Sequence, residues 1–137
     1  MKVVVDTMLW VSYCTLRGGY RHRLIERARR QRVRLFVSEY ILKELFNVLV
    51  EDLKLTRRYA TLACRTVARI AKLIDLPPIV VRYVPGDPND DPIVQTGLMA
   101  RADYLVTADA EILLVGKVQD LTILTATEFE ERLASNV

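Results

Sequence analysis

The sequence contains few of the residues on which several common chemistries depend. It has one histidine and two cysteines in 137 residues. A single chain therefore lacks the two histidines that metal-free acid–base cleavage of RNA requires. A Ser-His-Asp or Cys-His site would have to use His22, which lies between Arg21 and Arg23 in a solvated basic segment. Cys14 and Cys64 are far apart without a Cys-x-x-Cys, so we expect reduced cysteines in a cytoplasmic protein, with no disulfide framework or zinc knuckle.

Long apolar runs and nucleotide-binding motifs are also absent. No segment approaches the roughly 18 apolar residues of a membrane span, and the run before Asp6 is too short for a signal peptide. We therefore expect a soluble protein without a membrane partner. Neither a Gly-x-x-x-x-Gly-Lys-Ser/Thr loop nor a Gly-x-Gly-x-x-Gly fingerprint occurs, which removes support for nucleotide cofactors. The run Asp6-Thr7-Met8 also lacks the second aspartate that haloacid-dehalogenase-like hydrolases carry after the first strand.

The composition and the charge distribution indicate a globular domain with a polyanionic partner. Hydrophobic residues make up 51% of the chain, which is enough for a core, and the length suits a single domain over residues 1–137. Eight arginines and one glutamate lie between Arg17 and Arg34, although the net charge of the whole chain is only +3. Such asymmetry indicates a polyanionic partner, and this stretch could hold nucleic-acid phosphates, with an ordinary solvated helix face as the alternative. The residues that we expect to contact the RNA backbone are Arg21, Arg23, Arg27 and Arg30.

Short β-branched runs alternate with amphipathic stretches along the chain. This alternation predicts an α/β fold of three layers, with helices on both faces of a central parallel sheet. Strands are expected over 2–5, 34–37, 79–84, 104–107 and 121–124. Helices are expected from residue 7 onward and over 20–30, 38–53, 56–73, 92–101 and 111–115, with a last helix after a capping box at 127–130. The helix over 56–73 is expected to bury Leu62, Val67, Ile70 and Leu73.

Four acidic residues stand where such a sheet presents its ligand-binding edge. They are Asp6, Glu44, Asp90 and Asp109. Ligands bind outside the carboxyl ends of the strands in open α/β sheets, and Asp6 and Asp109 follow two of the predicted strands. Taken singly, each residue has a structural alternative: the aspartates could cap helices, and Glu44 could be an ordinary solvated residue. Their joint placement favours a shared site.

Carboxylates gathered in one crevice repel one another unless a cation neutralises them. Oxygen-only ligands favour Mg²⁺ or Mn²⁺ over Zn²⁺. With histidine nearly excluded as a general base, metal activation of water is the remaining easy route to phosphodiester hydrolysis. The four acids are thus the candidate catalytic and metal-binding residues. Asp87 and Asp91 are interpreted as turn or cap residues. Residues expected to support the site are Thr7, Thr107 and, more weakly, Glu111.

Three blocks of the sequence carry a family resemblance. The first is Val3-Val-Val-Asp6-Thr7-Met8, the second is Ser38-Glu-Tyr-Ile-Leu-Lys-Glu44-Leu45, and the third joins Asp87-Pro-Asn-Asp90-Asp91-Pro to the segment from Ala102 to Leu113. Together they resemble the PIN-domain family of nucleases, and in particular the VapC-like toxins of bacterial and archaeal toxin–antitoxin pairs. The resemblance spans nearly the whole chain, and its most specific part runs from Ala102 to Leu113.

This resemblance implies a PIN-like fold and a Mg²⁺- or Mn²⁺-dependent endoribonuclease. It places the family's acidic quartet on Asp6, Glu44, Asp90 and Asp109, with Asp90 chosen over Asp91 because the family's ligand precedes the Asn/Asp-Pro pair. It further implies a homodimer that a cognate antitoxin inhibits.

One position departs from the family pattern. The family usually has Asn after Asp-Thr, whereas this chain has Met8, which lacks the amide that would orient the site or the substrate. A catalytically weak or inactive protein of the same fold, which binds RNA or a partner, is therefore the main alternative. A DNA nuclease related to flap endonucleases is a weaker third alternative, because the chain lacks room for that group's extra DNA-binding elements.

Overall fold

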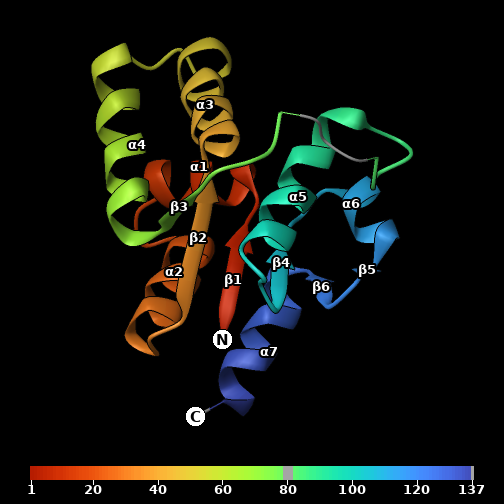
Figure 1. Cartoon of the computed structure of the whole chain (residues 1–137). Helices are drawn as coiled ribbons and strands as arrows, with labels where there is room; N and C mark the ends of the chain where they lie inside the picture. The colour runs from red at the N-terminus through yellow and green to blue at the C-terminus, as the bar shows by residue number, and fades with distance from the viewer. Residues whose placement is uncertain (79–81, 137) are drawn as a thin grey trace.

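The computed structural model describes residues 1–78 and 82–136 (Figure 1). Its centre is a six-stranded sheet in the order β3-β2-β1-β4-β6-β5. All neighbouring strands pair in parallel except β5 and β6, which are antiparallel. This arrangement confirms the predicted α/β class with a mostly parallel sheet. The strands are β1 (Lys2–Val5), β2 (Arg34–Ser38), β3 (Lys72–Ile74), β4 (Tyr104–Val106), β5 (Lys117–Val118) and β6 (Leu121–Leu124).

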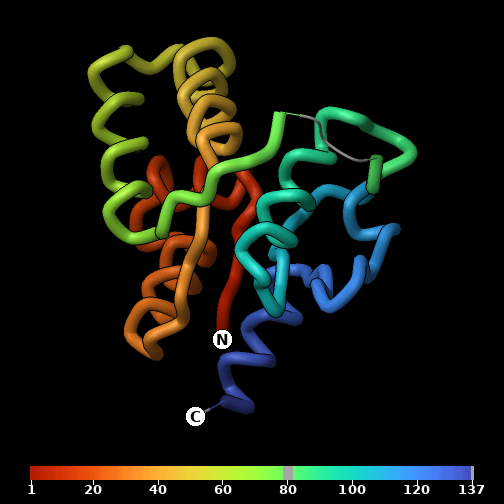
Figure 2. The backbone as a smooth tube through the Cα atoms, in the orientation of Figure 1, coloured from red at the N-terminus to blue at the C-terminus, as the bar shows by residue number. Residues whose placement is uncertain are grey.

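Helices cover both faces of the sheet, and their paths can be followed along the backbone tube in Figure 2. Helix α5 packs against β1, β2 and β4 on one face. The connections from β1 to β2 and from β2 to β3 run in the opposite direction across the sheet from the one that contains α5. Because parallel crossovers are right-handed, their helices lie on the other face, where α7 contacts α2. The helices are α1 (Thr7–Thr15), α2 (Tyr20–Arg30), α3 (Glu39–Asn47), the π-helical η1 (Val48–Asp52), α4 (Arg57–Ile70), the 3₁₀ turn η2 (Pro88–Asp90), α5 (Asp91–Met99), α6 (Ala110–Val115) and α7 (Ala126–Ser135).

The central strands are apolar throughout because helices cover them on both faces. Val3, Val4 and Leu105 are fully buried between the two helical layers. Helix α5 approaches the sheet closely at Gly97, where an added Cβ would stand 2.7 Å from the Leu121 side chain. The glycine therefore sets how near α5 lies to β6.

The register of the sheet aligns the residues that follow the central strands. Val5 pairs with Val106, and the Asp6 amide donates to the Val106 carbonyl at 2.9 Å. The Thr107 amide in turn donates to the Leu124 carbonyl at 3.0 Å. Asp6 and Thr107 consequently emerge side by side at the carboxyl edge of the sheet.

Four details differ from the sequence prediction. Helix α4 ends at Ile70, and the next residues form the edge strand β3, because pairing with β2 outweighs the helical pattern. Leu62 and Leu73 are 48% and 51% exposed, so their predicted burial was wrong. The last helix begins with a capping box at Thr125 and Glu128, two residues earlier than predicted. The short strand β5 was not predicted.

The strand predicted over 79–84 lies partly outside the described residues, and its described part, residues 82–84, is not a strand. In the described part of the chain, no helix is long and apolar enough to cross a membrane.

Candidate metal centre

Asp6 lies at the carboxyl end of β1 and is only 5% exposed. Its Oδ1 accepts from the Thr7 amide at 2.6 Å and caps α1, while Oδ2 accepts from the Thr107 hydroxyl at 2.6 Å. Burial raises the pKa of Asp6, and the two hydrogen bonds only partly oppose this rise. Asp6 therefore caps α1 as one interpretation predicted, and its metal-binding role stays a prediction.

Glu44 projects from α3 toward the same edge. Its Oε1 accepts a hydrogen bond from the Thr7 hydroxyl, so Thr7 joins the start of α1 to α3 through a side-chain contact. Burial raises the pKa of Glu44, and the charges of Asp6, Asp87 and Asp109 raise it further against the Thr7 hydrogen bond. Glu44 thus lies within the electrostatic reach of acids from three other segments.

Asp90 is the least satisfied of the four acids. It precedes α5 at the N-cap position, but its side chain makes no capping hydrogen bond. The residue is 8% exposed, and its Oδ2 is buried without a hydrogen-bond partner among the described residues. Burial, followed by the charges of Asp109, Asp87, Asp6 and Glu44, raises the pKa of Asp90 to about 7. An ionised oxygen in this position is costly unless a cation neutralises it.

Asp109 begins α6 and is tied to Asp6 through one hydroxyl. Its Oδ1 accepts from the backbone amides of Glu111 at 2.8 Å and Ile112 at 3.2 Å. The Asp109 amide donates to the Thr107 hydroxyl at 3.0 Å, and that same hydroxyl donates to Asp6. The fully buried Thr107 therefore sets the positions of Asp6 and Asp109 relative to each other.

The structure brings the four predicted acids together at the carboxyl edge of the sheet, close enough for their charges to act on one another. Within residues 1–78 and 82–136, no three Asp, Glu, His or Cys side chains converge as closely as direct ligands of one ion. The site supplies only oxygen donors, and the unpartnered Asp90 oxygen is the group that a cation would neutralise. These residues fit a hard divalent ion such as Mg²⁺ or Mn²⁺, which keeps several water ligands in proteins.

Asp87 and Tyr40 also lie at this edge of the sheet, and neither was predicted from the sequence to belong to the site. Asp87 caps η2 by accepting from the Asn89 amide at 2.9 Å, as a turn residue should, but its charge also acts on Asp90 and Glu44. Tyr40 lies one helical turn before Glu44 and donates to the Asn89 carbonyl at 2.7 Å. Burial and the neighbouring carboxylates raise the pKa of Tyr40 to about 12. The spacing of Tyr40 and Glu44 on α3 was the available signal for Tyr40.

Three further positions near the acids, Asp91, Glu111 and Met8, have contacts or exposure different from those of the four acids. The buried Asp91 accepts from the amides of Tyr83 at 2.8 Å and Val84 at 2.7 Å and pairs with Arg82 at 3.2 Å, so it holds the preceding loop. The exposed Glu111 lies against Gly86, where an added Cβ would stand 2.0 Å from its carboxylate. Met8 is 48% exposed in the first turn of α1, next to Asp6 and Thr7.

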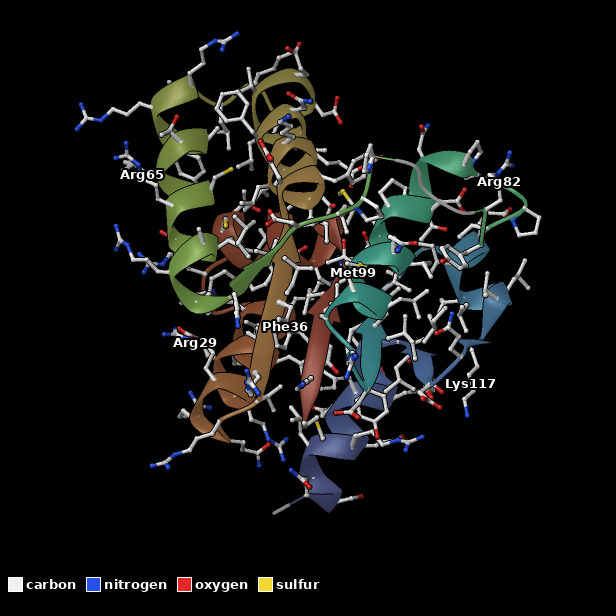
Figure 3. The ribbon with its side chains drawn as sticks, in the orientation of Figure 1. Arg29, Phe36, Arg65, Arg82, Met99 and Lys117 are labelled. Carbon is white, nitrogen blue, oxygen red and sulfur yellow. The ribbon has the colours of Figure 1, made fainter. Side chains whose placement is uncertain are left out.

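The arginines predicted to bind RNA all lie on α2 but at different distances from the acids. Helix α2 leads into the start of β2, so its C-terminal turn lies at the sheet edge opposite the acids. Arg21 is in the first turn, where it donates to the Ser12 hydroxyl at 3.1 Å and its charge lowers the pKa of Asp6. Basic side chains in the last turn also suit the negative end of the helix dipole. Figure 3 shows Arg29 on α2 and Arg65 on α4 extending outward from the ribbon.

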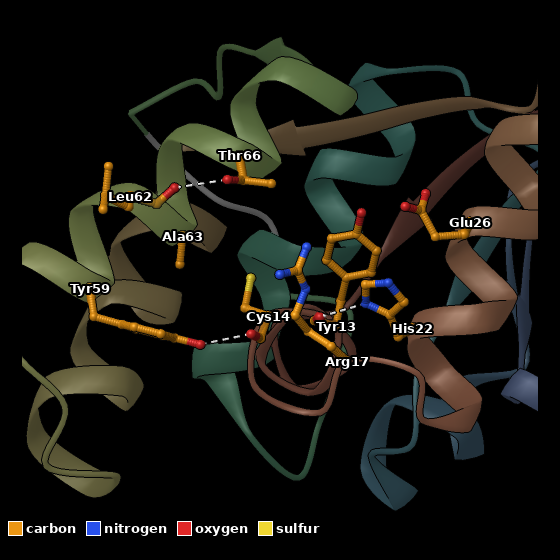
Figure 4. A pocket seen from close by; sticks show the side chains of 9 residues that line it. All are labelled: Tyr13, Cys14, Arg17, His22, Glu26, Tyr59, Leu62, Ala63 and Thr66. Carbon is orange, nitrogen blue, oxygen red and sulfur yellow. Dashed lines mark hydrogen bonds between the residues drawn. The ribbon is translucent and has the colours of Figure 1, made fainter.

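A hollow of about 320 Å³ lies between α1, α2 and α4, away from the acids (Figure 4). The ring of Tyr13 stacks on His22 there with centroids 4.5 Å apart, and His22 Nδ1 lies 2.9 Å from the Tyr13 carbonyl. On the opposite side, Tyr59 donates to the Cys14 carbonyl at 2.7 Å. His22 is thus engaged in packing, and the hollow contains none of the four acids.

The comparisons with known proteins agree with the α/β fold. A family model described as a PIN domain matches residues 2–111. The fold resembles a chain of VapBC2 from Rickettsia felis, solved with a DNA fragment from their promoter, with a TM-score of 0.67, 14% identity and coverage of 91% of this chain and 98% of that one. It also resembles PAE2754 from Pyrobaculum aerophilum, with a TM-score of 0.69, 17% identity and coverage of 98% and 90%. No curated protein matches the chain.

Proposed function

The chain belongs to the PIN-domain family, and from this membership we propose that it is a Mg²⁺- or Mn²⁺-dependent endoribonuclease that hydrolyses phosphodiester bonds. The observation that carries this proposal is the buried, unpartnered Asp90 oxygen among three other carboxylates. Such a group destabilises a metal-free fold and gains most from a bound cation. The proposed catalytic and metal-binding residues are Asp6, Glu44, Asp90 and Asp109.

Asp6, Glu44 and Asp90 each have a defined task in the proposed reaction. A bound divalent ion would lower the pKa of an attacking water and neutralise charge on the phosphate. Thr107 fixes Asp6 by donating to Oδ2, which leaves the remaining lone pairs of the carboxylate for the ion or its water shell. Thr7 orients Glu44 in the same way. Asp90 must lose its proton before it can contribute a charge, because burial holds its pKa near 7.

The RNA backbone is proposed to approach from the α2 side. Arg21 is the α2 arginine whose charge acts on Asp6, and its guanidinium is held by Ser12. A guanidinium in this place would pair with a phosphate next to the cleaved bond. Arg23, Arg27 and Arg30 would contact phosphates progressively farther from the acids, because α2 runs away from them. Such contacts position RNA without reading its sequence.

We further propose that the chain is the toxin of a toxin–antitoxin pair. The family resemblance of the three acidic blocks and the similarity to a chain of VapBC2 support this proposal. The partners would be a cognate antitoxin that blocks cleavage and a second copy of the chain in a homodimer.

Met8 supports a second candidate function. An exposed thioether beside Asp6 makes no strong hydrogen bond to an ion's water shell or to RNA, unlike the family's amide. A PIN-fold protein with this change could bind RNA or a partner without cleaving it. RNA cleavage with Mn²⁺, compared with the same reaction in EDTA, separates the two candidates across a panel of structured and single-stranded RNAs.

Asp6→Asn tests the proposed mechanism directly. Asparagine retains one oxygen that can accept from the Thr7 amide and cap α1, and its NH2 group can donate to the Thr107 hydroxyl oxygen, so the fold should persist. The lost charge should reduce metal-dependent cleavage by at least about a hundredfold. Circular dichroism supplies the folding control. Undiminished cleavage by a folded Asp6→Asn protein would remove Asp6 from the mechanism.

A further inference from the structure

Tyr40 links the two segments that carry Glu44 and Asp90. It lies in the first turn of α3, one helical turn before Glu44, so both side chains share one face of the helix. Its hydroxyl donates at 2.7 Å to the carbonyl of Asn89, which is 49 residues away in the chain. Asn89 belongs to η2 and directly precedes Asp90. The hydrogen bond thus connects the helix that carries Glu44 to the turn that carries Asp90, although the two segments are distant in the sequence.

Electrostatic repulsion acts between the two acids whose segments this hydrogen bond connects. Glu44 is among the carboxylates whose charges act on Asp90, and the two repel each other when both are ionised. Among the described residues, the other hydrogen bonds around η2 are local: Asp87 caps η2, and Asp91 holds the loop before it. Deeper in the structure, Thr96 of α5 donates a buried hydrogen bond of 2.8 Å to Ser38, which ends β2 and caps α3. Tyr40 adds a connection at the level of the acids themselves.

We propose that Tyr40 is a positioning residue that fixes the separation of Glu44 and Asp90 for capture of a divalent cation. This role rests on the proposed function, because it requires that the two acids share an ion. The phenol proton is committed to the Asn89 carbonyl, so Tyr40 holds backbone in place and does not supply a proton to the reaction. The tyrosine stays protonated at neutral pH, so the connection persists while the acids ionise.

The chain supplies a matched control for this proposal. Tyr59 on α4 also donates to a backbone carbonyl at 2.7 Å, that of Cys14, but it lies in the hollow between α1, α2 and α4 (Figure 4). Tyr40→Phe and Tyr59→Phe each remove one hydroxyl and one such hydrogen bond while keeping the ring. Only Tyr40→Phe releases the turn that carries Asp90.

The test is Mn²⁺ binding by isothermal titration calorimetry on the wild-type chain and both variants. Tyr40→Phe should raise the Kd for Mn²⁺ by about tenfold, which is the low end for residues that orient metal ligands. Tyr59→Phe should leave the Kd within about twofold of wild type, although thermal denaturation should show similar small losses of stability in both variants. RNA cleavage by Tyr40→Phe should recover to the wild-type rate when Mn²⁺ is raised well above its Kd.

Four outcomes would overturn the assignment. An unchanged Kd in Tyr40→Phe, or an equal weakening in Tyr59→Phe, would show that Tyr40 does not set the separation of the acids. Cleavage that stays low at saturating Mn²⁺ would indicate that Tyr40 contacts the RNA instead. If the wild-type chain binds no Mn²⁺, the proposed function and this role fail together, whereas a normal wild-type Kd with an unaffected Tyr40→Phe overturns the role of Tyr40 alone.

Discussion

Mn²⁺ binding should strengthen about tenfold between pH 6 and pH 8. The proposed ligation requires Asp90 as the carboxylate, and burial among other acids raises its pKa to about 7. With that pKa, Asp90 is ionised in about one tenth of the molecules at pH 6 and in about nine tenths at pH 8. The pKa values of Asp6 and Glu44 are raised as well, so any protons that they release add to the trend in the same direction.

Calorimetry in two buffers of different ionisation enthalpy measures both the affinity and the protons released. Close to one proton per ion should leave at pH 6 and far fewer at pH 8. In Asp90→Asn the affinity should be lower and its dependence on pH flatter, because the titrating group is gone. A wild-type Kd that is the same at pH 6 and pH 8 would refute the reasoning, as would an unaltered pH dependence in Asp90→Asn.

The raised pKa of Asp90 should also make the metal-free protein less stable as the pH rises, whereas Mn²⁺ binding strengthens. The pKa of Asp90 is raised in the folded state above its ordinary value of 3.8, so the folded state holds this proton more tightly than the unfolded state. Its contribution to stability is present below about pH 4 and is lost as the pH rises through about 7. In EDTA at pH 8, Asp90→Asn should therefore melt at a higher temperature than wild type, and the difference should shrink toward pH 5.

Other substitutions test the packing and the basic helix. Thr107→Val should lower the free energy of unfolding by about 1–3 kcal/mol in urea titrations, because it leaves the Asp109 amide and an Asp6 oxygen unpaired; a neutral change would contradict its linking role. Gly97→Ala should destabilise by about 1 kcal/mol, since the clash with Leu121 exceeds the gain in helix propensity, and a stabilised variant would show that the contact relaxes freely. Replacing the α2 arginines by alanine should flatten the slope of log K against log salt for single-stranded RNA by about 0.7 per lost phosphate contact, whereas an unchanged slope would place the RNA elsewhere.

The sequence correctly predicted helices and strands in which the local residue pattern favours the same structure as the packing against the rest of the fold. The run Lys2 to Val5 is short, β-branched and buried on both faces, and the basic helix from Tyr20 to Arg30 has clear breaks at each end, so both were located correctly. The prediction was wrong at β3, where Lys72–Ile74 continues a helical pattern but pairs with β2. A three-residue edge strand is defined by its neighbour, which local periodicity does not report.

For the candidate site, the sequence indicated which residues gather but not how they are held. Strand ends and spacing predicted that Asp6 and Asp109 would meet, and they do so through Thr107. The bond from Tyr40 to Asn89 joins a side chain to a distant carbonyl, and no sequence pattern encodes such a contact. The metal, catalytic and single-domain assignments remain predictions.

The four acids differ in what each contributes to the fold, apart from the proposed catalysis. Asp6 and Asp109 each close the first turn of a helix, so selection for a folded protein alone would retain them. Asp90 closes none and carries an oxygen that destabilises the ion-free fold. In homologues that keep the fold but no longer cleave RNA, the acid at position 90 should therefore be replaced before the acids at positions 6 and 109. The residue at position 90 should then distinguish catalytically active homologues from inactive ones.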